Sequence, residues 1–308
     1  MKDGAYLHWH LHFDGSKYDG LITADEAEED MLEYDKPCYA ITDHGTINAV
    51  IQLHDKCKKH KKKFVPGSEI YVVNDKNEKL DGPRRKKFDK KRHLVLLAMN
   101  KKGFDNIIYL NTLANMHFFS KPRVDHDDVF DHNEGVIVTT ACLGGVIASP
   151  LLWDDEADQK LRIKNATEIA FRYREAFGDR FYLELQPVEK EEQLILNRFL
   201  IWLHKTHGFQ IIATNDAHYA KKEQYIYHAR LIALQNRNSD EGGELIYKPG
   251  HHLRNLYEMR DAFKANGIYE YASNEVEGAL ETANTLHERF EGVVLDKKLK
   301  IPEYKEIQ

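Results

Sequence analysis

Short apolar runs alternate with helical patterns along most of this chain, and this alternation constrains the fold more than any other feature. The expected strands are 39–42, 64–65 with 70–73, 93–98, 136–140, 181–185 and 211–214. Buried strands that are joined by helical crossovers form βαβ units with parallel strands. A series of such units predicts an α/β protein, and we favour a barrel of the TIM type over a doubly wound sheet.

Helical patterns fill the spaces between the expected strands. Thr23 and Glu26 form a capping box that opens the first helix, which ends near Tyr34. The next helices are expected at 47–57, 106–116, 158–177 and 191–207, and, once the strand pattern stops near Lys221, at 225–235, 257–264 and 274–288. We therefore divide the chain into a barrel, residues 1–220, and a helical extension that packs on it, residues 221–308.

Composition excludes several classes of protein. The chain has 308 residues and a net charge of −6, which argues against a protein that coats DNA electrostatically. No apolar run approaches the ~18 residues of a membrane span, and the N-terminus lacks the apolar region of a signal peptide. The three cysteines, Cys38, Cys57 and Cys142, are too few and too scattered for a disulfide framework. We expect a cytoplasmic protein with no membrane partner.

Histidine is abundant, with 17 residues in the chain, and it is the commonest metal ligand in proteins. His8, His10 and His12 alternate in an extended segment, so their side chains lie on one face. Two imidazoles on one face can hold one metal ion, and Asp19 follows closely in a turn. Alone, such a pair is more often an edge or surface feature than a metal site.

More residues with metal-binding side chains lie next to the expected strands. In a βα barrel, side chains at the C-terminal ends of successive strands face one common site. The residues concerned are Asp43 and His44 after 39–42, Glu69 after 64–65, His93 at the start of 93–98, Cys142 after 136–140, and Asp216 and His218 after 211–214. Each alone is more often structural, but together they indicate a metal site at one rim of the barrel.

The motifs that contain these residues resemble the PHP (polymerase and histidinol phosphatase) domain, in the form found at the N-terminus of the bacterial DNA polymerase III alpha subunit. They are His10-x-His12, Asp19-Gly20, Thr42-Asp43-His44-Gly45, Gly67-x-Glu69-x-Tyr71, His93-Leu94-x-Leu96-Leu97-Ala98, Lys121-Pro122-Arg123, Ala141-Cys142-Leu143-Gly144-Gly145, Phe181-Tyr182-Leu183-Glu184-Leu185-Gln186 and Ala213-Thr214-Asn215-Asp216-x-His218-Tyr219. They occur in the order of the family and cover nearly the whole chain.

The resemblance implies a distorted (β/α)7 TIM-like barrel with a trinuclear metal site at its C-terminal rim. The implied ligands are His10, His12, Asp19, His44, Glu69, His93, Cys142, Asp216 and His218. His8 has no ligand role in this assignment. Imidazole and carboxylate ligands suit Zn²⁺, Mn²⁺ or Fe, and the thiolate of Cys142 would add a soft donor that favours Zn²⁺. The expected cofactors are therefore three divalent metal ions.

Catalytic and substrate-binding roles follow from the same assignment. Glu69 is expected to bridge two cations, and Asp43 to orient a neighbouring ligand imidazole. Arg123 is expected either to contact a substrate phosphate or to form a surface ion pair. The basic run that contains Arg84, Arg85 and Arg92 leads into His93, and it would either guide a polyanion to the metals or be a solvated loop.

The expected activity is that of a metal-dependent phosphoesterase on the 3′ end of DNA, a 3′–5′ exonuclease of the proofreading type. Two alternatives stay open: a small-molecule phosphomonoesterase of the histidinol-phosphatase type, and a non-catalytic module stabilised by metal. The chain has no Pro-Asp-x-Asp-x-Asp signature, and Asp125-His126-Asp127 is expected in a loop, so it should not polymerise DNA. It is expected to be either a free-standing partner of a separately encoded replicative DNA polymerase or a domain of a longer chain.

Overall fold

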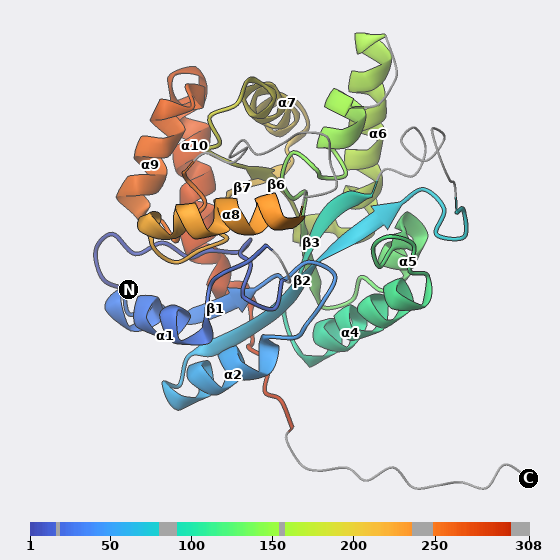
Figure 1. Cartoon of the computed structure of the whole chain (residues 1–308). Helices are drawn as coiled ribbons and strands as arrows, with labels where there is room; N and C mark the ends of the chain where they lie inside the picture. Colours follow the sequence, from blue (N-terminus) through green and yellow to red (C-terminus); the bar gives the residue numbers. More distant parts are fainter. Residues whose placement is uncertain (17–18, 80–90, 154–157, 236–248, 297–308) are drawn as a thin grey trace, which may run out of the picture.

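A computed structural model describes residues 1–16, 19–79, 91–153, 158–235 and 249–296 of the chain. A curled, seven-stranded mixed sheet lies at its centre, and helices cover the outside of the sheet (Figure 1). The strands are β1 (Cys38–Ile41), β2 (Lys63–Val73), β3 (Arg92–Ala98), β4 (Val124–Asp125), β5 (Val136–Thr139), β6 (Phe181–Leu185) and β7 (Gln210–Ala213). This arrangement confirms the predicted α/β fold of the distorted-barrel type.

The helices agree closely with the sequence pattern. They are α1 (Ala24–Glu33), α2 (Val50–Lys59), α4 (Lys101–Met116), α5 (His126–Asp131), α6 (Gln159–Phe177), α7 (Glu191–His207), α8 (Tyr225–Gln235), α9 (Leu256–Ala265) and α10 (Ile268–Thr285). The loop expected at 125–127 is wrong, because α5 begins there. Asp125 caps this helix and forms a capping box with Asp128, whose backbone N–H donates to the Asp125 carboxylate at 3.1 Å.

The sheet order is β1-β2-β3-β5-β6-β7, with β4 paired to β2. The pairs β1–β2, β5–β6 and β6–β7 are parallel, as the sequence predicts, but β3 is antiparallel to both of its neighbours. A parallel connection needs a crossover that is usually a helix, and the described residues between β2 and β3 contain no helix. The consequence is that β3 begins where β1 and β5 end, so His93 lies at their C-terminal rim.

The segment of the alternating histidines completes the barrel wall between β7 and β1. His12 N–H donates to the carbonyl oxygen of Ala217 at 2.7 Å, and Ala217 N–H donates to that of His10 at 3.1 Å. On the other side, Thr42 N–H donates to the carbonyl oxygen of Leu11 at 3.1 Å. Because both edges of this segment are bonded, the side chains of His10 and His12 are held on one side of the wall.

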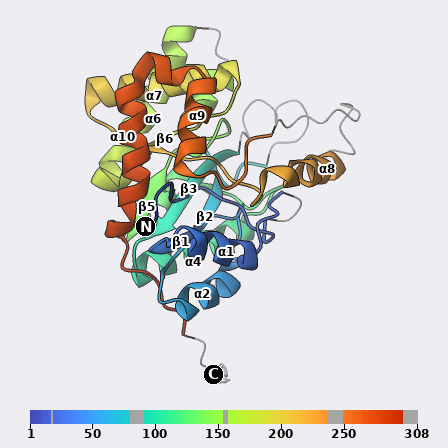
Figure 2. The ribbon, with the colours of Figure 1, turned by 90° about the vertical axis from the view of Figure 1, so that its left-hand side faces the viewer.

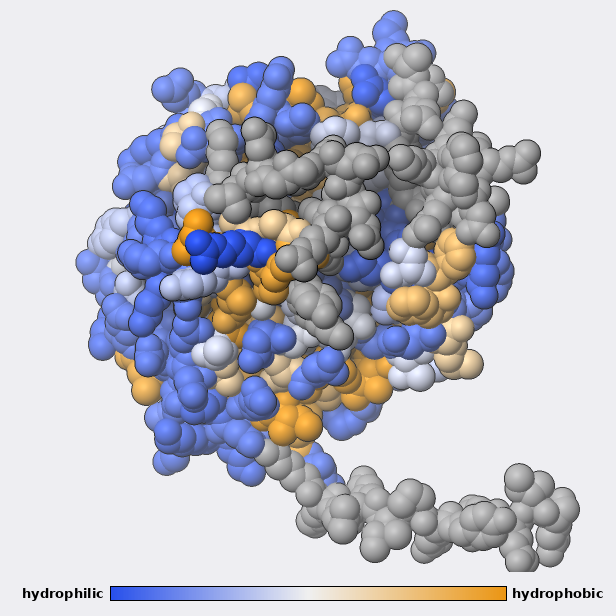
Figure 3. All heavy atoms as spheres, viewed as in Figure 1, coloured by the Kyte–Doolittle hydropathy of each residue, from blue (hydrophilic) through white to orange (hydrophobic). Residues whose placement is uncertain are grey.

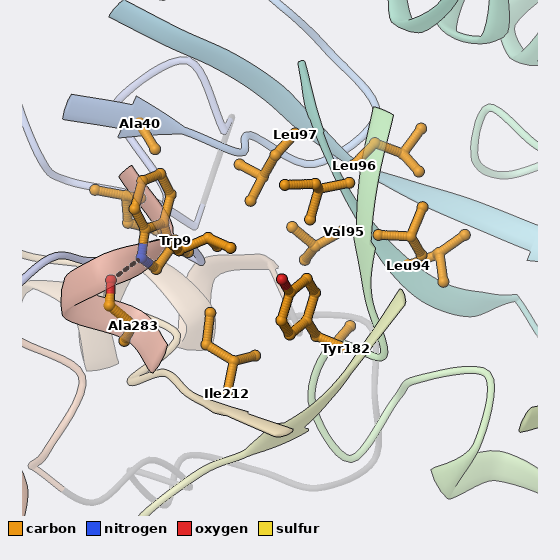
Figure 4. Packing of buried hydrophobic residues seen from close by; sticks show 14 of the residues in the cluster. Trp9, Ala40, Leu94, Val95, Leu96, Leu97, Tyr182, Ile212 and Ala283 are labelled. Carbon is orange, nitrogen blue, oxygen red and sulfur yellow. Dashed lines mark hydrogen bonds between the residues drawn. The ribbon is translucent and has the colours of Figure 1, made fainter. Parts of the chain in front are cut away.

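Trp9 occupies the opposite side of that wall and joins the barrel to α10. Its indole N–H donates to the carbonyl oxygen of Ala283 at 2.7 Å (Figure 4). Its ring stacks on Phe290. Leu94–Leu97 of β3, Tyr182 and Ile212 belong to the same buried cluster. Burial of this aromatic side chain, with its N–H bonded to a carbonyl oxygen, stabilises the junction by about 2–3 kcal/mol.

The helices α9 and α10 of the predicted extension lie side by side (Figure 2). Val276, Ala279 and Leu280 of α10 are buried in the same hydrophobic cluster as the barrel strands. The extension is thus continuous with the barrel core, and the domain boundary at 220/221 stays a prediction.

Hydrophilic residues cover most of the face seen in Figure 3, and apolar residues form separate patches there. Among the described residues, no helix has the length and apolar character needed to cross a membrane.

A pair of glycine substitutions tests the packing of α4. A Cβ on Gly103 would lie 1.9 Å from the carbonyl oxygen of Gly135, whereas a Cβ on Gly278 of α10 would meet no heavy atom within 4 Å. Gly103→Ala should therefore lower the free energy of unfolding by about 1–3 kcal/mol through overpacking. Gly278→Ala should raise it by up to about 1 kcal/mol through helix propensity. Urea denaturation of both variants measures the difference, and equal effects would contradict this packing.

Candidate metal centre

Imidazole and carboxylate groups from widely separated parts of the chain converge at the rim of the barrel. Every predicted ligand except Cys142 belongs to at least one group of three whose ligand atoms lie within 4.8 Å of one another. These groups are His12, His44 and His218; His10, His12 and Glu69; Asp19, His218 and His228; His44, Glu69 and His93; and Asp216, His218 and His251. The barrel therefore brings together residues that are far apart in the sequence.

Glu69 lies at the centre of the cluster and is almost completely buried. One carboxylate oxygen, Oε1, lies 3.4 Å from His10 Nε2 and 2.9 Å from His93 Nδ1. The other, Oε2, lies 3.4 Å from His12 Nε2 and 2.6 Å from His44 Nδ1. Each oxygen thus faces two imidazoles on a different side, which is the arrangement that a carboxylate needs to bridge two cations.

Asp19 and Asp216 flank Glu69 on either side of the cluster. Asp19 Oδ2 lies 2.8 Å from His44 Nε2, and its Oδ1 lies 3.4 Å from His218 Nε2. Asp216 Oδ1 lies 3.1 Å from His10 Nε2 and 3.2 Å from His12 Nε2. Asp216 adopts φ of +49°, a conformation that is uncommon for a non-glycine residue and that concentrates at functional sites.

Cys142 lies at the edge of the cluster rather than inside a group of three. Its Sγ is 3.7 Å from His93 Nδ1 and accepts a hydrogen bond from Gly144 N–H at 3.4 Å. Ala141 before it has φ of +58°, which turns the chain sharply after β5. Burial, together with Asp216 and Glu69, raises the pKa of this thiol well above its usual value, so the thiol needs a cation nearby to become a thiolate ligand.

Unpartnered polar atoms show that the cluster fits metal ions. The buried atoms without a hydrogen-bond partner include His10 Nε2, His12 Nε2, His44 Nδ1, both carboxylate oxygens of Glu69, and Asp216 Oδ1. Each such atom costs about 1–3 kcal/mol when nothing satisfies it. Two ligands on one tetrahedral Zn²⁺ lie about 3.3 Å apart, and the separations of 3.1–3.4 Å among His10, His12, Glu69 and Asp216 match that spacing. The donor set therefore suits divalent cations.

Without a cation, the cluster balances its carboxylates by protonating imidazoles. Burial disfavours the charged form of His218, but Asp19 and Asp216 outweigh burial and raise its pKa to about 9. Burial likewise opposes the charged form of Glu69, but the surrounding imidazoles hold its pKa well below the usual range. His12 behaves differently, because burial and then its neighbours His44 and His218 lower its pKa to about 3.

Glu184 is a functional residue that the sequence analysis missed. This buried carboxylate on β6 accepts a hydrogen bond from His10 Nδ1 at 2.6 Å, so it fixes the ring with Nε2 toward Glu69 and Asp216. Thr214 and Gln186 also donate to its Oε1, at 2.5 and 2.7 Å. The sequence did carry a signal for this role, because Glu184 is a charged residue inside an apolar strand. Buried carboxylates are rare in proteins unless they are paired.

His228 and His251 also lie beside the cluster although no role was assigned to them. His228 Nε2 on α8 is 3.4 Å from Asp19 Oδ1. A ring nitrogen of His251, Nδ1, is 3.0 Å from the carbonyl oxygen of Asp216. Both come from the predicted extension, where no strand ends and no spacing indicates a ligand.

Asp43 lies one step away from the predicted ligands. Its Oδ1 accepts hydrogen bonds from Phe13 N–H at 2.7 Å and from the Ser16 hydroxyl at 3.0 Å. The Ser16 oxygen in turn lies 3.3 Å from His12 Nδ1 and accepts from His44 N–H at 3.0 Å. Asp43 therefore positions two ligands through Ser16 and contacts neither imidazole directly.

The structure describes two of the four predicted arginines, Arg92 and Arg123. Arg123 is fully buried, which does not fit a surface ion pair, and its guanidinium donates to the carbonyl oxygens of Glu78 at 2.7 Å and His117 at 3.3 Å. Its contact with a substrate phosphate stays a prediction. Arg92 is buried on β3 and donates to the side-chain oxygen of Asn74 at 2.7 Å. Arg84 and Arg85 lie outside the described residues.

The site and the barrel define a class, an α/β barrel whose rim carries clustered imidazoles and carboxylates that could hold metal ions. A family model described as the PHP domain matches residues 8–187. This match covers more than half of the chain, and the chain belongs to the PHP domain family. Family membership together with the clustered donors supports a metal-dependent phosphoesterase as the class of activity.

Relatives in sequence are alpha subunits of DNA polymerase III. The DNA polymerase III subunit alpha of Aquifex aeolicus is 34% identical over 240 residues, which cover 76% of this chain and 20% of that protein. The subunit of Borreliella burgdorferi is 29% identical over 280 residues, which cover 88% of this chain and 23% of that protein. The chain thus spans about a fifth of the length of the curated relatives it matches.

Solved structures with a similar fold are more distant. An amidohydrolase from Chromobacterium violaceum, 13% identical, covers 70% of this chain and 88% of its own, with a TM-score of 0.44. A two-domain protein from Bacteroides vulgatus, described as containing a predicted PHP-like metal-dependent phosphoesterase, is 12% identical and covers 86% of this chain and 64% of its own, with a TM-score of 0.40.

Metal binding should release protons from the cluster. A cation competes with the protons that the carboxylates hold on His10, His44 and His218, so metal affinity should rise with pH up to about 9, where His218 deprotonates by itself. Calorimetric titration of the chelator-treated protein with Zn²⁺, in two buffers of different ionisation enthalpy at pH 7, measures the protons released. Zero proton release would contradict this charge balance.

Glu184→Gln should weaken metal binding without unfolding the protein. The amide keeps the shape but no longer serves as an anionic acceptor for His10 Nδ1–H, and loss of such a partner typically costs 10- to 100-fold in metal affinity. Competition with a metal-sensitive dye measures the change. Glu175→Gln on the outside of α6 serves as the control and should bind metal like the unchanged protein. Equal affinities in both variants would remove Glu184 from the site.

Proposed function

We propose that this chain is a metal-dependent phosphoesterase that removes nucleotides from the 3′ end of DNA, with the three implied cations held by the nine predicted ligands. The observation that carries the proposal is the set of buried, unpartnered donor atoms on His10, His12, His44, Glu69 and Asp216, which meet at one point of the rim. A structural remnant of a metal site would not need to keep this costly arrangement. The polymerase relatives support DNA as the substrate.

The chain's own residues perform three tasks in this proposal. Glu69 positions four imidazoles, two beside each of its carboxylate oxygens. Glu184 keeps the proton of His10 on Nδ1, so that Nε2 stays free to bind a cation. Divalent cations at such a site activate a water and stabilise the charge that develops during phosphoryl displacement.

The position of the cluster supports access by a small reacting group rather than by a long duplex. His10, His12 and Glu69 are buried, whereas the side chains of His44 and His93 are 16% and 23% exposed. A substrate therefore reaches the cations from the side of His44 and His93. A chain end fits such an approach better than the middle of a strand does.

A separately encoded replicative polymerase stays the proposed partner.

A labelled-DNA assay tests the proposal. The metal-loaded protein should shorten 5′-labelled single-stranded DNA and mismatched primer–template DNA from the 3′ end in the presence of Mn²⁺ or Zn²⁺. His12→Ala removes a ligand and should lower the rate by more than the 10- to 100-fold expected for a supporting residue. His132→Ala is the matched control, because His132 stacks on Tyr109 outside the cluster, and it should leave the rate unchanged.

Three outcomes would contradict the exonuclease proposal. Equal shortening by His12→Ala would attribute the activity to a contaminant. Faster phosphate release from small monoesters than nucleotide release from DNA would favour the phosphomonoesterase alternative. A melting temperature that falls on chelation, with no hydrolysis of any substrate, would favour the non-catalytic module.

A further inference from the structure

A cavity of about 300 Å³ lies beside the metal cluster and is lined partly by residues with no role so far. Three of the predicted ligands, His93, Cys142 and Asp216, form one wall. Gln193 from the start of α7 and Arg254 from the segment before α9 also line it. The volume is at the lower end of the roughly 300–1,000 Å³ typical of small-molecule pockets.

Arg254 brings a positive charge to this cavity. Its Nη1 is buried and has no hydrogen-bond partner, and the carboxylates of Glu258 and Glu189, the second of which also lines the cavity, act on the guanidinium only through their charge. The backbone is fixed, because His8 Nε2 contacts the Arg254 carbonyl oxygen at 2.9 Å and Asn255 caps α9. Burial lowers the pKa of this guanidinium. A buried donor without an acceptor is costly, so an acceptor oxygen in the cavity, such as that of a phosphate, would stabilise Nη1.

Gln193 supplies a hydrogen-bond acceptor to the same cavity. Its side chain is fully buried, and its Nε2 donates to Asn197 Oδ1 at 3.0 Å. The amide of Asn197 cannot be reversed, since its Nδ2 donates to the Gln186 carbonyl oxygen at 2.8 Å and its Oδ1 accepts from Gln186 N–H at 3.3 Å. Gln193 Oε1 is therefore the atom left without a partner.

We propose that this cavity binds the terminal nucleotide of the substrate, with Arg254 on a phosphate oxygen and Gln193 accepting a hydrogen bond from a sugar hydroxyl or base amino group. The pairing follows from the two unsatisfied groups, because one is a donor that needs an acceptor and the other an acceptor that needs a donor. A nucleoside monophosphate carries both. The proposal rests on the proposed function and adds Arg254 to it as a phosphate contact.

Binding of small ligands to the full chain tests this proposal independently of turnover. The probes are 2′-deoxyadenosine 5′-monophosphate, deoxyadenosine and inorganic phosphate, titrated by calorimetry into protein of verified metal content. Arg254→Met should lower the affinity for the monophosphate by about 10- to 100-fold, as expected for loss of a charge-assisted hydrogen bond. The affinity for deoxyadenosine should not change. Arg254→Lys should recover part of the affinity. Gln193→Met should lower the affinity for the monophosphate and for deoxyadenosine about 5- to 10-fold. Its affinity for inorganic phosphate should not change.

Arg172→Met is the matched control, because Arg172 is half exposed and pairs with Asp127 away from the cavity; it should bind all three probes normally. Unchanged monophosphate binding by Arg254→Met at equal metal content would overturn the proposal, and so would inorganic phosphate binding as tightly as the monophosphate. DNA digestion with an unchanged KM in Arg254→Met would refute this inference and leave the exonuclease standing. Monophosphate binding that depends on Arg254, without any digestion of DNA, would support this inference and contradict the exonuclease proposal.

Discussion

The buried carboxylate of Glu69 is the constraint on which the rest of this structure depends. A carboxylate in an apolar interior is expensive unless positive charge or hydrogen-bond donors surround it. Here four imidazoles surround it, from His10, His12, His44 and His93. His44 and His93 come from separate parts of the rim, whereas His10 and His12 belong to the same extended segment of the wall. The fold must therefore bring these segments together around one point, and it leaves that point unsatisfied until cations bind.

The antiparallel direction of β3 is how the barrel meets this requirement. In an all-parallel barrel, a residue at the start of a strand lies at the opposite end from the active rim. His93 is near the start of β3, yet it bridges to Gly145 just after β5 and faces Glu69. Reversal of this one strand moves its first residues to the functional rim. The distortion of the barrel is thus part of the site and not a defect of the fold.

Much of this arrangement was predictable from the sequence, and the failures have physical causes. The apolar pattern located the strand β6 and the helix α7 to the residue, because both are regular and well bounded. The direction of β3 was not predictable, since an apolar run carries no sign of its neighbour's direction. The burial of Arg123 was not predictable, because a sequence shows a charge but not where the side chain lies. Glu184 was missed because its meaning depends on a contact with His10, 174 positions away in the chain.

The predicted boundary at residue 220 separates residues that the site uses together. His228 and His251 approach Asp19 and Asp216 from beyond that boundary, and Arg254 lines the cavity beside the ligands. Trp9 and the α10 carbonyl of Ala283 tie the two parts together directly behind the alternating histidines. The extension closes one side of the ligand cluster, and a closed, partly dry site is where a fixed positive charge acts most strongly on a phosphate.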